Sequence, residues 1–460
     1  MSFRGQFTQV LSEGVMRKGL SVCILIGATT ALSGCMDAPL MSKLSDVKPV
    51  AFVRDQMAAP APMVTGAPQL AAANSDSGSE IISGLISRRS VLDAGSPYDT
   101  LASTLLETSS GVAQAELRAA KMRSVSRDKN WLPTIGPSIS LTSLGEFAAG
   151  LLVNQVLYDN GKKKAEREFA AADVEVAAVV LAQDENDRVH SGLELLVVAA
   201  EAREKTAMAQ SGLGRMREFN RVVGERVRGG LSSLADERVV HSKISEMEHE
   251  AATHSEARDS AISELRSMMS GHSVPELSAP SGIKLASSSL ETLDVVRARA
   301  EAKRASAEAH VERASLLPTL SATGLIGKNS SAALDYEGSG LGLGTRAEME
   351  ASKAREGAAL ALVGRAQETA ARQRSRLDSS LQALSRKERD AADLVQQSRA
   401  NYRLFQDQFE AGKKTVMDVL SVYEQMVRDE LKHIDVKYEI VQTQLEAARL
   451  AGVLANGAEI

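Results

Sequence analysis

The chain has 460 residues, of which 43% are hydrophobic and only 3% are aromatic, and this length suits two or three ordinary domains. Aromatic rings usually fill globular cores, so their scarcity, together with 25% charged residues, favours long helices that meet along narrow seams. The net charge of −5 argues against nucleic acid as the main partner.

Residues 1–34 have the pattern of a bacterial export signal. The basic pair Arg17-Lys18 precedes an apolar run over 20–32, which is too short for a transmembrane helix. The run ends at Leu32-Ser-Gly-Cys35, which resembles a lipobox, so Cys35 is expected to become the lipidated first residue of the mature protein. The alternative is an ordinary signal peptide followed by a chance cysteine. The other cysteine lies inside the removed segment, so no intramolecular disulfide is expected.

The first repeat is predicted over residues 99–271, after a tether over 35–98 that is rich in alanine, proline, serine and glycine. A helix over about 100–128 ends before Pro133, because proline disfavours a helical conformation in the preceding residue. Alternating polar and apolar residues then predict strands over about 134–143 and 149–158, each long enough for a tilted membrane-spanning strand.

A very long helix is predicted from Lys162 to Arg228, because this stretch contains no proline and little glycine. Gly230 can adopt the left-handed conformation that ends a helix, and Ser233 with Asp236 forms a capping-box pattern that starts the return helix to about Met269. The sequence therefore predicts a helical hairpin with its tip at Gly230, followed by a linker over 272–289.

The second repeat, predicted over 290–455, follows the same order of elements. Leu316-Leu-Pro-Thr319 matches Trp131-Leu-Pro-Thr134 at a shift of 185 residues, and strands are predicted over about 320–327 and 338–346. A long helix over about 347–409 leads to a second tip at Gly412, where Thr415 and Asp418 repeat the capping box at a shift of 182. The last helix returns to about residue 450.

Four strands in one chain cannot close a barrel, and an open sheet edge is not tolerated in lipid. Cyclic association of three chains gives a 12-stranded barrel, which lies within the range of outer-membrane barrels. The expected fold is thus mainly α with a small membrane β part, in which duplicated helix–strand pair–hairpin repeats form a trimeric barrel continued by a periplasmic helical barrel.

These features resemble the TolC family of outer-membrane export channels over about residues 100–455. The matching motifs are the paired Leu-Pro-Thr entries, Leu157-Tyr-Asp-Asn-Gly-Lys162, and above all the stretch from Glu410 to Leu420. The resemblance implies a homotrimeric duct in the outer membrane with a long periplasmic portion, and the lipobox at Cys35 adds a lipid anchor. Its partners would be an inner-membrane pump and a periplasmic adaptor, and its cargo would be drugs or secreted polypeptides.

The resemblance also assigns roles to residues at the two tips. Asp418 falls where the family places a ring of acids at the periplasmic entrance, and Lys414 and Phe409 fall near positions that hold the entrance closed. Ser421 stands where the family often has a second acid. The residues expected to contact the adaptor are those at the tips: Gly230, Leu231, Gly412 and Lys413.

Asp418 also has a purely structural interpretation, because the third position after Thr415 favours an acid at a helix start. The entrance interpretation gains from a polar stripe of Asp418, Ser421, Gln425 and Asp429, whose helical spacing suits a water-filled lumen. Asp236 shares the cap without a comparable stripe, so it is interpreted as structural.

Two Glu-x-x-His patterns, Glu246/His249 and Glu430/His433, resemble ligands of metal-binding helical bundles, but they lie off the apolar seams and are interpreted as solvated. The glycines over 338–344 are interpreted as a close-packed strand and not as a phosphate loop. No catalytic, metal or cofactor-binding group is predicted. The rivals to a passive duct are a periplasmic lipoprotein adaptor with long hairpins and a metal-binding bundle oxidase.

Overall fold

A computed structural model describes residues 78–457, except 142–146, 277–282, 284–289, 328–329 and 339–341; the side chains of 140–149 are likewise not described. The elements in chain order are α2 (Glu80–Ile86), α3 (Pro97–Glu107), α4 (Val112–Asp128), β1 (Thr134–Leu141), β2 (Phe147–Tyr158), α5 (Lys162–Arg228), α6 (Leu234–Met268), α7 (Leu293–Ser315), β3 (Thr319–Gly327), β4 (Ser331–Glu337), α8 (Thr345–Glu410) and α9 (Val416–Ala451). The described part is therefore mainly helical with one small sheet.

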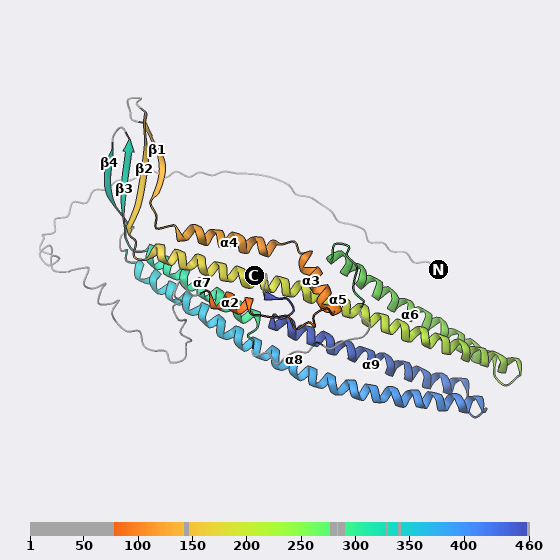
Figure 1. Ribbon diagram of the computed structural model, residues 1–460. Coiled ribbons are helices and arrows are strands. Elements are labelled where there is room, and N and C mark those ends of the chain that lie inside the picture. The colour runs from red at the N-terminus through yellow and green to blue at the C-terminus, as the bar shows by residue number, and fades with distance from the viewer. Residues whose placement is uncertain are drawn as a thin grey trace, which may run out of the picture. The chain divides into compact units, whose positions relative to one another are not determined.

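The sheet lies at one end of the described unit and the two helical hairpins, α5/α6 and α8/α9, extend from it to the other end (Figure 1). Near the sheet the helices pack side by side in the order α4, α5, α7, α8. Near the tips the order is α6, α5, α9, α8. At both levels the helices form a single layer, and α5 and α8 run through its whole length.

The four strands are antiparallel in the order β1-β2-β3-β4, so each strand pairs with its neighbour in sequence. The middle pair joins the two repeats, because β2 belongs to the first and β3 to the second. Consequently the duplicated halves share one sheet and do not form two separate ones.

The core runs along the helical layer in three clusters. One lies around α5 and the end of α9, with Leu193, Tyr438 and Leu445 fully enclosed. A second joins the two hairpins near the tips, and a third packs α4 and α7 on α5. Many buried positions are alanine, which lets long helices approach closely with few aromatic rings, as the composition predicts.

The structure has the long helices and both hairpin tips where the sequence predicts them. α5 is a single helix over Lys162–Arg228, and α8 extends the predicted 347–409 by two residues at its start and one at its end. The first three strands overlap their predicted ranges. Within the described residues, no helix is long and apolar enough to cross a membrane.

The fourth strand is predicted wrongly over 338–346, since β4 occupies Ser331–Glu337. Only three residues separate β3 from β4, so the chain turns back at once and β4 pairs with β3 along its whole length. The glycine-rich stretch lacks the side chains that stabilise cross-strand pairs. Its described residues, Gly338 and 342–344, lie outside any strand and lead into α8.

Two further predictions need correction near the start. The predicted helix over 100–128 is two helices, α3 and α4, separated by Gly111 in a left-handed conformation (φ +65°). The predicted tether over 35–98 ends earlier than expected, because α2 folds within it under a Ser79 cap. Tertiary contacts hold this segment: the buried Arg88 donates to the carbonyl of Glu291 at 2.8 Å and to that of Ala451. Residues 35–77 lie outside the described range.

Candidate functional site

The two hairpin tips share one backbone design. Gly230 and Gly412 have φ of +73° and +72°, the left-handed conformation expected of them. At the first tip, the amide of Leu231 donates to the carbonyl of Arg226 at 2.7 Å. At the second, the amide of Lys413 donates to Gln408 at 2.8 Å. These bonds satisfy carbonyls that the helix end leaves free. They require a residue with positive φ at the turn, which is why glycine is needed in both turns.

Both return helices begin with a reciprocal capping box. The Ser233 amide donates to the Asp236 carboxylate at 2.9 Å, and the Ser233 hydroxyl accepts from the Asp236 amide. Thr415 and Asp418 form the same pair at the same distances. The caps predicted from the sequence are therefore confirmed for both hairpins.

The predicted entrance residue Asp418 lies on the surface of the tip. Its carboxylate accepts from the Thr415 amide and hydroxyl, and these hydrogen bonds hold the pKa of Asp418 below its ordinary value. The Ser421 hydroxyl donates to the Asp418 carbonyl at 2.9 Å. Lys414 places its ammonium 4.6 Å from the centre of the Phe405 ring. The geometry of Asp418 alone suits a helix cap as well as an entrance.

The polar stripe predicted below Asp418 is present on α9. Ser421 and Gln425 are exposed, and Gln425 donates to Asp429 at 2.9 Å. On the opposite side of the helix, Val419, Tyr423 and Met426 are buried. Thus α9 has one polar, solvent-exposed face and one buried apolar face near its start.

Phe409 is not at the surface of the tip but is 1% exposed, in the core between the hairpins. Its ring lies 5.2 Å from that of Phe219, and the Arg226 guanidinium lies 4.6 Å from its centre. Arg226 also donates to the Phe409 carbonyl at 3.0 Å. Sequence reasoning missed Arg226, and its place among other arginines at the helix end gives no signal that it crosses to the other hairpin.

Exposed apolar side chains also mark the tips. Leu231 is 72% exposed, Leu234 66% and Met417 51%, and Lys413 next to Gly412 is exposed as well. Single exposed apolar residues are ordinary on surfaces, but three gathered at chain turns fit a contact surface. The four residues predicted to contact an adaptor all lie at these turns.

The sheet has two chemically different faces, which follow from its register. Residues paired directly across strands share a face, and successive residues alternate. A bulge between Val156 and Tyr158 places Tyr158 opposite Leu320 and so keeps it on the apolar face. Among the described side chains, the apolar face comprises Ile135, Pro137, Ile139, Leu151, Val153, Tyr158, Leu320, Ala322, Gly324, Ile326, Ala332, Leu334 and Tyr336, together with the amide side chain of Gln155.

This apolar face is exposed to an extent unusual for a soluble surface. Ile139 is 72% exposed, Leu334 71% and Tyr336 73%. The opposite face carries most of the hydroxyl and amide groups and two acids: Thr134, Ser138, Asn154, Thr319, Ser321, Thr323, Ser331, Asp335 and Glu337, with Leu152, Val156 and Leu325 among them. A sheet of this kind suits lipid on one side and water on the other.

The sheet and the helical layer are both open at two edges. In the described part of the chain, β1 and β4 each pair on one side only. β1 directly follows α4 and β4 directly precedes α8, and these are the two outer helices of the layer near the sheet. The open edges of the sheet and of the layer therefore coincide, which suits association of one chain's β4 and α8 with another's β1 and α4.

The two Glu-x-x-His patterns have different surroundings. Glu246 and His249 are exposed, as predicted. The prediction was wrong for Glu430, which is 5% exposed and accepts from Arg399 of α8 at 2.6 Å. His433 contacts Glu388 of α8 at 3.0 Å. Both residues thus join α9 to α8, and among the residues described no three His, Cys, Asp or Glu side chains form a metal site.

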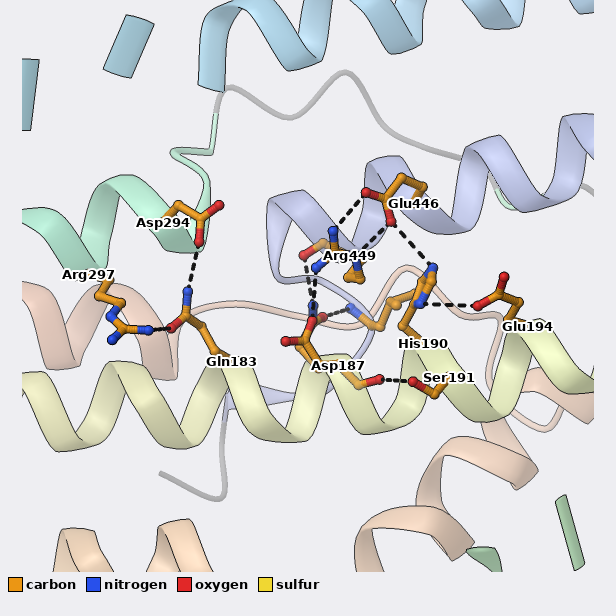
Figure 2. A network of polar contacts seen from close by, with 11 residues as sticks. Gln183, Asp187, His190, Ser191, Glu194, Asp294, Arg297, Glu446 and Arg449 are labelled. Atoms are coloured by element: carbon orange, nitrogen blue, oxygen red, sulfur yellow. Dashed lines mark hydrogen bonds and ion pairs between the residues drawn. The ribbon is translucent and has the colours of Figure 1, made fainter. Parts of the chain in front are cut away.

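In the first half of α5 a polar network joins this helix to α7 and α9 (Figure 2). Arg449 of α9 contacts Asp187 at 3.1 Å and Glu446 at 2.7 Å, and Glu446 contacts His190 at 3.5 Å. On the α7 side, Gln183 donates to Asp294 at 3.0 Å. The network fixes the end of α9 and the start of α7 on the continuous helix α5.

Neither a protein-family model nor a curated protein sequence matches this chain. Solved structures do match. The outer membrane protein VceC from Vibrio cholerae is 16% identical with a TM-score of 0.68, over 77% of this chain and 96% of VceC. The outer-membrane channel OprN is 17% identical with a TM-score of 0.70, over 85% and 98%.

The open state of the Neisseria gonorrhoeae MtrE outer membrane channel is 15% identical with a TM-score of 0.65, over 79% of this chain and 91% of MtrE. These identities are low, and the likeness extends over nearly the whole of each matched chain. The chain therefore has the fold of the TolC-type outer-membrane channels, and the resemblance drawn from the sequence is confirmed at the level of the fold.

Proposed function

We propose that this chain is the outer-membrane exit duct of a tripartite export system and that it works as a homotrimer. The observation that carries the proposal is the four-stranded sheet with an exposed apolar face, a polar face and two open edges, standing on a helical layer with the same two open edges. Within the described ranges of one chain, the apolar face stays exposed and no further strand pairs with β1 or β4.

Cyclic association satisfies both. Pairing of β4 with β1 of the next chain removes the sheet edges, which a bilayer requires, and α8 packs on α4 of the same neighbour. Three chains with four strands each give twelve strands, an even number in the range of outer-membrane barrels. The apolar face then contacts lipid and the polar face lines the lumen. The helices continue the duct into the periplasm.

The amphipathic ring side chains fit this placement. Tyr158 and Tyr336 lie in one row on the apolar face, at the end of the sheet nearest the helices, and the exposed Trp131 precedes β1 at the same end. Tyrosine and tryptophan prefer the boundary between lipid and water. This row is proposed as the periplasmic boundary of the bilayer.

The tips are proposed to dock a periplasmic adaptor that joins the duct to an inner-membrane pump. Leu231 and Lys413, next to the turn glycines, would contact it, and Gly230 and Gly412 hold the turns. Asp418 and Ser421, supported by Lys414, are proposed to line the entrance, while the buried Phe409 would hold the two hairpins together. Chemical crosslinking of Gly412→Val and wild type to the adaptor tests the docking; equal crosslinking and equal export would count against it.

Cys35, which lies outside the described residues, is proposed as the lipid attachment site. Metabolic labelling with palmitate should mark the wild type and not Cys35→Ser, and both should reach the outer membrane because the strands hold the protein there independently. An unlabelled wild type would overturn this assignment without affecting the duct.

The test of the duct itself is ion conductance of the purified protein in planar bilayers, combined with membrane fractionation. Long-lived conductance by an outer-membrane trimer is expected. A soluble, non-conducting monomer would overturn the proposal and favour a periplasmic adaptor.

A further inference from the structure

The charges of the sheet are all of one sign. Across β1, β2, β3 and β4 the only Asp, Glu, Lys, Arg or His residues are Asp335 and Glu337, both on β4. Twelve-residue β2, the longest strand, carries none. The described sheet therefore contributes two negative charges and no positive charge.

Both acids lie on the polar face. Asp335 pairs with Ser321 and Glu337 with Thr319, two positions from each other on the same strand. The Thr323 hydroxyl donates to the Asp335 carboxylate, which fixes that carboxylate over the polar face. Asn154 of β2 stands opposite Thr323, so the polar row continues across three strands.

The two acids differ from most charged residues of the helices in their contacts. No ion pair of either acid occurs among the described residues, although ion pairs are numerous along the helices. Asp335 is exposed, and its partner is a neutral hydroxyl. The electric field of an exposed, unpaired carboxylate extends into the adjoining water over one Debye length, which is ~10 Å at 0.1 M salt.

We propose that Asp335 and Glu337 make the sheet end of the duct selective for cations over anions. This inference rests on the proposed function, in which the polar face lines a shared lumen. Three chains then place six carboxylates, two from each, around one water-filled cross-section near the join between sheet and helices. A ring of like charges on a low-dielectric wall concentrates counter-ions and excludes ions of its own sign. The field favours positively charged solutes and disfavours anionic ones at this level.

The test is the reversal potential of single channels in a potassium chloride gradient. The double variant Asp335→Asn/Glu337→Gln keeps the shapes and removes the charges, so the permeability ratio of potassium to chloride should fall by about twofold or more. Asn154→Asp adds a carboxylate to the same face and should raise the ratio. Asp236→Asn, which removes an acid at the first hairpin tip, serves as the matched control and should leave the ratio unchanged.

The outcomes separate this inference from the duct. Wild-type protein that does not conduct overturns the proposed function. Conducting channels whose ratio is unchanged by both the double variant and Asn154→Asp overturn the selectivity and leave the duct intact. Crosslinking of each variant into trimers checks assembly, and Asn154→Asp keeps the inference testable should the double variant fail to assemble.

Discussion

The two long helices α5 and α8 are repeats of one design with different surroundings. α5 buries 25 of its 67 residues, whereas α8 buries 8 of its 66. α5 packs against helices on both sides at every level, and α8 is an outer helix of the layer. Equivalent helices in a duplicated chain therefore differ in how much of their surface is buried, because one lies inside the layer and the other lies at its edge.

The two helices can be compared position by position with the shift of 182 residues that aligns the tips. Ala209 and Leu213 of α5 correspond to Ala391 and Val395 of α8, and all four are buried. Burial at these positions is therefore common to the two repeats.

A second face is buried only in α5. Phe219 is 5% exposed, and its counterpart in α8 is the exposed Asn401. Gly212 allows α6 and α9 to approach together, since an added Cβ would lie 2.5 Å from the Tyr423 hydroxyl and 2.9 Å from the Met247 methyl. Its counterpart Leu394 is 45% exposed. In the proposed homotrimer, the exposed face of α8 is the surface that meets the neighbouring chain.

The largest effect is expected for Phe219→Ala. Truncating a buried ring that packs on Phe409 should lower the free energy of unfolding by about 3–5 kcal/mol. Asn401→Ala, at the equivalent position, should change it by less than about 0.5 kcal/mol. Urea unfolding of both variants in detergent measures the contrast. Equal losses would mean that α5 has no second packed face.

Next in size is Leu394→Glu on the free face of α8. The chain should fold, because this side chain is half exposed. The free energy of association should become less favourable by about 1.5–3 kcal/mol per interface, because an apolar contact is lost and a charge is buried in its place. Analytical ultracentrifugation should show dissociated chains. Met417→Glu, an equally exposed site at the tip, is the control and should assemble normally. Wild-type assembly of Leu394→Glu would place the interface elsewhere.

Gly230→Val should cost about 1–2 kcal/mol, because a β-branched residue is strained at φ +73° although no neighbour crowds the added Cβ. Gly229→Val is the matched control, with φ −82° in the ordinary region, and should cost less. Gly412→Val should resemble Gly230→Val, because the tips share one geometry. Thermal unfolding decides this, and a cost at Gly229 equal to that at Gly230 would contradict the conformational argument.

His190 supplies a pH-dependent contrast with Arg372, its exposed counterpart in α8. Burial holds the pKa of His190 below its ordinary value, despite the nearby Glu446, Glu194 and Asp187, with Arg449 acting in the same direction as burial. In the window below the ordinary pKa of about 6.5, the unfolded chain binds a proton that the folded chain does not. Stability is therefore full above that value and is lost as the pH falls through the folded pKa.

The change in melting temperature between pH 7.5 and pH 5.5 should be smaller in His190→Gln than in wild type. His249→Gln, at an exposed site on α6, should behave as wild type. A pH dependence unchanged in His190→Gln would show that other groups cause it.

The smallest effects are expected for Asp236→Asn and Asp418→Asn, because each removes one exposed cap. The folded pKa of Asp418 is lowered, so its contribution to stability is present above the ordinary pKa and is lost as the pH falls through the folded value. The two variants should lower the melting temperature equally. Only Asp418→Asn should also reduce cation preference and block by multivalent cations in single channels; equal small shifts would leave Asp418 a capping residue alone.

The sequence by itself determined the parts of this protein that depend on local physics. Glycine at 230 and 412 and the two capping boxes specify helix ends within a few residues, and the absence of proline over 162–228 permits one long helix. The internal repeat made these signals stronger, because each appears twice.

What only the tertiary structure decided depends on contacts between distant segments. Pairing of β4 with β3 puts Asp335 and Glu337 beside Ser321 and Thr319, and the register between β2 and β3 joins this face to the polar face of β1 and β2. No local pattern fixes the pairing of β2 with β3. Phe409 is buried against α5, where Arg226 contacts it, and Glu430 of α9 is buried against α8, where Arg399 contacts it. The same helical repeat thus becomes an interior helix in α5 and an edge in α8, since burial is set by how many neighbours surround a helix and not by the helix itself.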